Sequence, residues 1–225
     1  MPLSAILAQL AAIAAQHDPA YPAALQPGLS RAALTTRLRA AGFAWQPPEE
    51  WFTLYQWRNG STATEEGAPN TPLFNYHAFM TLEEALAERA LWNDVNAAMY
   101  SVNRDMTPPD ASPATAPAQE EEADFVPYPP HLLPVFCFEG ECYAVECHVQ
   151  AQAHGRVHFL YQGDWVCYDS LQTMLAAKLE CHRTAGIYVR DADGCENCAD
   201  PAACAAILLR HNPCRAAELG DAAHP

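Results

Sequence analysis

The chain has 225 residues, half of them apolar, which is enough for a packed core in one large domain or in a domain with extensions. It carries 12 basic and 27 acidic residues, and its formal net charge of -15 argues against binding to nucleic acid or to an anionic membrane surface. A basic partner would be attracted instead. No segment approaches the roughly 20 apolar residues of a membrane span, and the apolar N-terminal segment lacks the positive charges of a secretion signal. We therefore expect a cytoplasmic protein whose nine cysteines are mostly reduced.

Helical patterns dominate the first part of the chain. Apolar residues recur at helical spacing from Leu3 to Ala15, with Ser4 as the expected cap. A second helix is expected from about Ser30 and a third from Pro48 to Arg58, because proline suits the first turn of a helix. Asn59-Gly60 is typical of a helix stop.

A capping box predicts one longer helix in the middle of the chain. After an expected strand at Leu73 to Met80, Thr81-Leu82-Glu83-Glu84 has the residue types with which a helix satisfies its first N–H groups. Its apolar positions are Leu86, Leu91, Val95 and Met99.

Residues 107–130 are rich in Pro, Ala and Ser and include the acidic run Glu120 to Glu122. Such a segment buries too little apolar surface to offset the entropy lost on ordering. We expect it to be a mobile insertion.

Strand patterns follow the insertion. Four segments rich in aromatic and β-branched residues are Pro134 to Phe138, Cys142 to Cys147, Arg156 to Gln162 and Asp164 to Tyr168. Glu139-Gly140 and Gln162-Gly163 supply turns, so neighbouring segments should pair as antiparallel hairpins. Ser170 then caps an expected helix, and a last strand is expected at Gly186 to Val189.

This order predicts an α+β fold, in which N-terminal helices precede a central, mostly antiparallel sheet and a helix follows the last hairpin. We divide the chain into an N-terminal helical extension (1–28), one domain (29–190) that contains the insertion, and a cysteine-containing tail (191–225).

The order of the segments resembles that of the Smi/Knr or SUKH superfamily, which includes the fungal cell-wall synthesis regulator and bacterial toxin-immunity proteins. The matching pieces are the helix Pro48 to Gly60, the acidic helix after Thr81, the strand starting Leu133-Pro134, Gly155-Arg156-Val157 and the helix starting Ser170-Leu171. The resemblance covers roughly Ser30 to Val189. The chain departs from the pattern at Gln46-Pro47-Pro48, where Leu-Pro is typical, and in its insertion and tail. The resemblance implies a protein that binds another protein through its sheet and bordering loops and has no catalytic centre.

We therefore expect a non-catalytic binding module, such as an immunity protein that neutralises a basic toxin. Loop and hairpin-turn side chains are the most available contacts, and our candidates are Glu65, Glu66, Glu139, Glu141, Asp164 and Trp165. Two alternatives stay open. The acidic insertion could recruit a cell-wall or signalling component in a regulatory scaffold, and the net charge could serve solubility alone.

The tail cysteines raise a third hypothesis, a structural zinc site. Cys195 and Cys198 have the spacing with which two thiolates grip zinc from a tight turn, and Cys204 and Cys214, or His211, could complete the ligands. The alternative is a tail with free thiols, or with a disulfide in an oxidising compartment.

The remaining candidates for chemistry have structural explanations. Cys137, Cys142, Cys147 and Cys167 lie among aromatic and β-branched residues, where cysteine usually fills a core. The adjacent Glu146, Cys147 and His148 are not expected to form a nucleophile and base, because neighbouring strand residues point to opposite faces. The chain also has no phosphate-binding glycine loop, metalloprotease helix or nucleophile elbow.

Overall fold

A computed structural model describes residues 1–63, 72–105, 128–161, 164–190 and 196–214. The α+β prediction is confirmed. The helices are α1 (Leu3–His17), α2 (Tyr21–Ala24), α3 (Arg31–Ala40), α4 (Glu49–Trp57), α5 (Leu82–Asp105), α6 (Leu171–Arg183) and α7 (Pro201–His211). In the described part of the chain, no helix is both long and apolar enough to cross a membrane.

Six antiparallel strands form the main sheet, in the order β3-β4-β5-β6-β7-β8. They are β3 (Pro72–Phe74), β4 (His77–Phe79), β5 (Leu132–Phe138), β6 (Glu141–Glu146), β7 (Val157–Tyr161) and β8 (Asp164–Tyr168). Two further antiparallel pairs lie outside this sheet, β1 (Leu25–Pro27) with β2 (Arg58–Ser61) and β9 (Tyr188–Arg190) with β10 (Glu196–Cys198).

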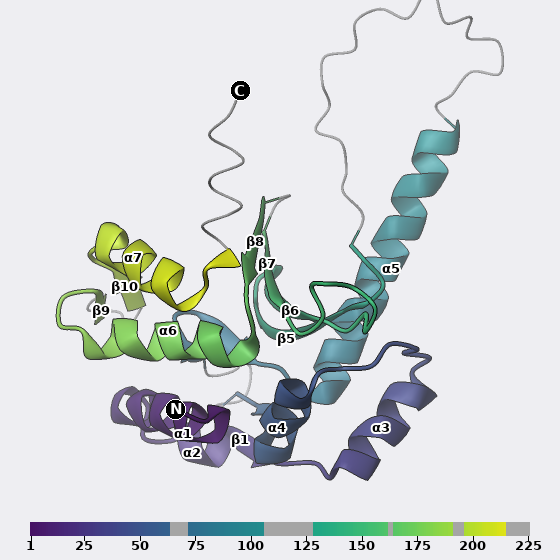
Figure 1. Cartoon of the computed structure of the whole chain (residues 1–225). Coiled ribbons are helices and arrows are strands. Elements are labelled where there is room, and N and C mark those ends of the chain that lie inside the picture. Colours follow the sequence, from purple (N-terminus) through teal and green to yellow (C-terminus); the bar gives the residue numbers. More distant parts are fainter. Residues whose placement is uncertain (64–71, 106–127, 162–163, 191–195, 215–225) are drawn as a thin grey trace, which may run out of the picture.

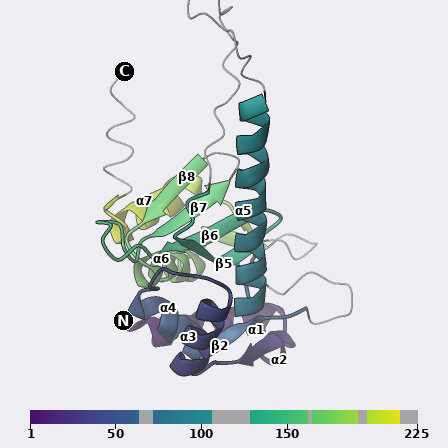
Figure 2. The same cartoon turned by 90° about the vertical axis from the view of Figure 1, so that its right-hand side faces the viewer.

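The main sheet lies between two helical layers. Helix α5 runs across one face, and α1, α4 and α6 lie on the other side (Figures 1 and 2). Successive side chains of β6 point to opposite faces of the sheet, so that both faces are buried. Tyr143 and Val145 join the large core with α1, α4 and α6. Cys142 and Ala144 point the other way, into a smaller core with Trp92 of α5.

Local capping chemistry sets three helix starts where the sequence predicts them. Ser30 accepts a hydrogen bond from the backbone of α3, and Ser170 forms a capping box with Thr173 at α6. At α5, the Glu84 carboxylate accepts the N–H of Thr81 at 2.7 Å, while the Thr81 hydroxyl accepts the N–H of Glu84 at 3.2 Å.

Two local predictions are wrong. Helix α1 has Pro2, rather than Ser4, at its N-cap. The strand expected at Leu73 to Met80 is a hairpin, since Asn75 adopts a positive φ of 49° between β3 and β4. The expected last strand is present as β9, shifted toward Arg190, and it pairs with β10 outside the main sheet.

The first and last helices belong to the main core. Leu7 and Leu10 of α1 are fully buried, and Ile207 and Leu208 of α7 join the same cluster. Asn212, which ends α7, is fully buried and accepts hydrogen bonds from the Asp169 backbone and the Thr173 hydroxyl at the start of α6. The segments at both ends of the described chain therefore pack on α6.

Candidate functional site

A cavity of about 560 Å³ opens between α5 and the outer end of the sheet. The turns of the β3–β4 and β5–β6 hairpins lie at this same end, since Ala78 pairs with Cys137 across β4 and β5. We call this cavity the α5 groove. Its apolar lining includes Tyr76, Ala78, Met80, Ala87, Leu91 and Phe138, and its acidic lining is Glu84, Glu88 and Glu139.

The α5 groove offers apolar surface to solvent. Leu91, one of the apolar positions of α5, is 54% exposed. Opposite the helix, the half-buried rings of Tyr76 and Phe138 contact each other with centroids 5.4 Å apart. An exposed leucine facing an aromatic pair is the kind of surface that receives an apolar side chain from a binding partner.

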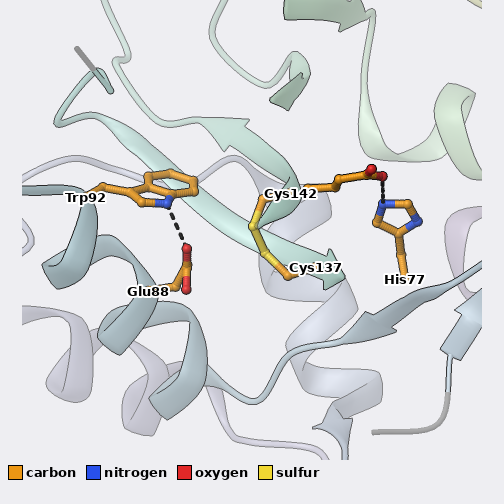
Figure 3. Close-up of a disulfide and its surroundings, with 6 residues drawn as sticks. His77, Glu88, Trp92, Cys137 and Cys142 are labelled. Carbon is orange, nitrogen blue, oxygen red and sulfur yellow. Dashed lines mark hydrogen bonds and ion pairs between the residues drawn. A yellow bond between two sulfur atoms is a disulfide. The ribbon is translucent and has the colours of Figure 1, made fainter. Parts of the chain in front are cut away.

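The three glutamates of the groove differ in how their side chains are held. Glu84 is held by the capping box at Thr81, and Glu88 accepts the indole N–H of Trp92 at 2.9 Å (Figure 3). Glu139 lies at the tip of the β5–β6 hairpin, is exposed and has a φ of 46°. No Lys, Arg or His is among the described residues that line the groove. The lining is therefore negatively charged.

A disulfide lies beside the groove. Cys137 and Cys142 are bonded across β5 and β6, with Cα atoms 4.3 Å apart, and Cys137 lines the cavity (Figure 3). Cys142 is buried in the smaller core, as expected, and Cys137 packs against that core, but the two residues are bonded to each other and are not reduced. The hairpin turn at Glu139-Gly140 makes them direct cross-strand partners, which puts their side chains within bonding reach.

Glu141 turns toward the interior instead of standing free. Its carboxylate lies 3.7 Å from Nε2 of His77, which is 4% exposed and sits among Phe74, Tyr143 and Phe159 (Figure 3). Burial, with a smaller effect from Lys178, lowers the pKa of His77 to about 3. The imidazole is therefore neutral near pH 7, and the contact is not an ion pair there.

The remaining predicted partner-binding residues are not among the described residues that line the α5 groove. Glu65 and Glu66 lie outside the described residues. Asp164 pairs with Tyr161 and Trp165 with Leu160 at the start of β8. By the strand register this is the same end of the sheet as Glu139 and Glu141, two strands and roughly 10 Å from β6. The structure thus gathers four of the six predicted residues at one end of the sheet.

The four predicted zinc ligands do not form one group. Cys195 lies outside the described residues. Cys204 is buried in the first turn of α7, whereas Cys214 follows that helix and donates from its thiol to the carbonyl of Cys167 at 3.6 Å. The helix between them spans roughly 10 Å, so the two thiols cannot share an ion. Within the described ranges, no group of three or more His, Cys, Asp or Glu side chains could hold a metal ion.

Sequence reasoning missed a neighbour of Cys204. Sγ of the buried Cys181, on α6, lies 3.8 Å from Sγ of Cys204. Burial and the neighbouring Cys204 raise the pKa of Cys181 to about 12. The two residues are 23 positions apart on different helices, so only the packing of α7 on α6 reveals the pair.

Cys147 is buried as expected for a core residue. Burial, followed by the charge of Glu146, raises the pKa of its thiol well above the ordinary value. The Glu146 carboxylate is itself held by Nε2 of His131 at 3.1 Å and by the backbone N–H of His148 at 2.8 Å. This group is therefore a packed polar cluster around a protonated thiol.

Residues 107–127, most of the insertion that the scaffold hypothesis uses, lie outside the described part of the chain.

No family model matches the chain, and no curated protein matches it either.

Proposed function

We propose that the chain is a non-catalytic, SUKH-like module that binds a basic protein, such as a toxin that it neutralises in the cytoplasm. The observation that carries the proposal is the α5 groove, where exposed apolar side chains and three carboxylates line one cavity. A basic partner could insert an apolar side chain against Leu91, Tyr76 and Phe138 while its cations face the glutamates.

Electrostatics support the same class of partner. The formal net charge of -15 attracts a cationic protein over long range, and Glu139 stands exposed at the groove's edge. Such attraction raises the association rate, and it weakens as salt shortens the screening length. The order of the segments, which resembles the SUKH superfamily, adds the expectation of a binding role.

The test is affinity capture from the native cell lysate, with the retained proteins identified by mass spectrometry and the interaction then measured with purified components. Wild type is compared with Leu91→Ser and Glu139→Ser, which change the groove. Asp94→Ser is the matched control, because Asp94 is an exposed acid on α5 that does not line the groove.

We expect a basic protein retained by wild type and by Asp94→Ser, with at least tenfold weaker binding for Leu91→Ser. Glu139→Ser should mainly slow association at low salt. Equal binding by all four proteins would remove the groove from the interface. Binding lost only on deletion of residues 107–127 would favour the scaffold alternative.

A further inference from the structure

Two buried cysteines face each other where α7 packs on α6 (Figure 1). Cys181 lies near the end of α6, and Cys204 lies near the start of α7. Their Sγ atoms are 3.8 Å apart, with the Cys181 thiol donating to the Cys204 sulfur. Cys181 is fully buried and Cys204 is 8% exposed. The structure therefore holds both residues as thiols in direct contact.

The two sulfur atoms need only a small movement to form a bond. A disulfide holds its sulfur atoms at about 2.0 Å, so bonding would bring this pair about 1.8 Å closer. Rotation of the two side chains and a slight shift of α7 can supply that movement. Cys181 and Cys204 are 23 positions apart on different helices. A bond between them would therefore link two elements that the backbone connects through residues 184–200.

Polar contacts hold the C-terminal end of α7 on α6. Nε2 of His211 lies 2.7 Å from the Glu180 carboxylate, and Asn212 accepts the Thr173 hydroxyl at 2.8 Å. Cys204 lies at the opposite end of α7, where its partner on α6 is a thiol. A covalent bond at Cys204 would fasten the helix at the end opposite to these polar contacts.

The thiols become accessible to a reagent when α7 opens locally. Cys204 lies on α7 itself, so it moves into solvent as that helix leaves α6, and Cys181 is then uncovered. Opening also removes the burial that raises the pKa of Cys181. Exchange with a dissolved disulfide therefore starts at Cys204 and ends at Cys181.

We propose that Cys181 and Cys204 form a reversible redox site, in which a small disulfide such as oxidised glutathione oxidises the pair and so bonds α7 to α6. The Cys204 thiolate attacks one sulfur of oxidised glutathione, forms a mixed disulfide and releases one glutathione thiolate. The Cys181 thiolate then attacks Sγ of Cys204, and the second glutathione thiolate leaves. The two protein thiols lose two electrons and two protons, which convert one oxidised glutathione into two reduced molecules. The site is independent of the α5 groove.

The test incubates the full-length protein in glutathione buffers of increasing oxidised fraction, alkylates the remaining thiols in denaturant and maps the disulfides by mass spectrometry. Mapping separates the proposed bond from the Cys137–Cys142 disulfide. Cys204→Ala removes one sulfur, and Cys214→Ser is the matched control, because its thiol donates to the carbonyl of Cys167. Hydrogen exchange of the α7 amides before and after oxidation gives a second readout.

We expect a Cys181–Cys204 bond in oxidised wild type and in Cys214→Ser, reversed by excess reduced glutathione. In both proteins, oxidation should slow exchange of the α7 amides at least tenfold, because the bond restricts opening from α6. Oxidation should leave α7 exchange in Cys204→Ala unchanged. The proposal is overturned if both thiols of wild type are alkylated at the highest oxidised fraction, or if Cys204 bonds to another cysteine. A bond that forms without slowing α7 exchange would also overturn it.

Discussion

The side-chain carbonyl of Asn59 accepts the backbone N–H of Leu82, the first residue of α5, at 3.0 Å. Helix α4 ends at Trp57, close to the stop predicted at Asn59-Gly60. Both residues lie in β2, and from there the Asn59 side chain also holds the start of α5. Because α5 forms one wall of the groove, this bond helps to set where that wall begins.

Asn59→Ala should lower the free energy of unfolding by about 1–3 kcal/mol, since the buried N–H of Leu82 would lose its acceptor. Chemical denaturation of wild type and variant measures the difference. Asn93→Ala is the control, because Asn93 is an exposed residue of α5, the helix that Leu82 begins. A loss for Asn59→Ala no greater than that of the control would show that the bond contributes nothing.

Gly60→Ala should be more destabilising than an ordinary alanine at positive φ. Gly60 has a φ of 80°, and an added Cβ would lie 2.3 Å from the backbone nitrogen of Thr81. Gly42, at a φ of 68° with open space around it, supplies the matched control. We expect about 1–2 kcal/mol for Gly42→Ala from backbone strain alone, and a clearly larger loss for Gly60→Ala. Equal losses in denaturation would mean that the close approach to α5 is absent in solution.

Reduction of the Cys137–Cys142 disulfide should destabilise the protein by about 2 kcal/mol, because the bond closes a short loop in the unfolded chain. Mass mapping of the unreduced protein identifies the bond, and thermal unfolding with and without reductant measures its effect. The double variant Cys137→Ser, Cys142→Ser should show no shift with reductant. A reductant shift of similar size in that variant would assign the effect to other cysteines.

Acid should destabilise the fold partly through His77. Its folded pKa of about 3 lies below the ordinary value of 6.5, so the unfolded chain takes up the proton more readily. Stability is therefore lost as the pH falls from about 6.5 toward 3, by at most about 1.4 kcal/mol per pH unit.

The variant His77→Phe should flatten this pH dependence relative to wild type, because phenylalanine fits the aromatic surroundings and does not titrate. Urea denaturation at several pH values between 4 and 7 gives the two slopes. The difference between them isolates His77 from His158, whose pKa burial also lowers, to about 4. Identical slopes would mean that His77 is hydrated or protonated in the folded protein.

Local chemistry explains what the sequence could predict. Ser30, Ser170 and the Thr81–Glu84 box lie within four residues of the N–H groups that they satisfy, so the pattern alone placed three helix starts. Segments rich in aromatic and β-branched residues, joined by Gly-containing turns, likewise predicted the hairpins β5–β6 and β7–β8.

The oxidation state of a cysteine pair and the contacts between distant segments could not be predicted from the sequence. The turn at Glu139-Gly140 already aligns Cys137 with Cys142, but a register does not say whether two thiols are oxidised. Cys181 could not be assigned to Cys204, since their approach depends on how α7 packs on α6. For the same reason only Glu139 of the residues that line the α5 groove was among the predicted contacts, and the exposure of Leu91 could not be predicted.

The packing of α1 on α6 also constrains how the chain folds during synthesis. Leu7 and Leu10 of α1 share the main core with Leu171 and Leu175 of α6, about 160 residues later in the chain. At roughly 5–20 residues per second, α6 leaves the ribosome about 10–30 seconds after α1. Throughout that interval the apolar stripe of α1 lacks its final covering. The nascent chain is therefore most prone to aggregation before its C-terminal third has been made.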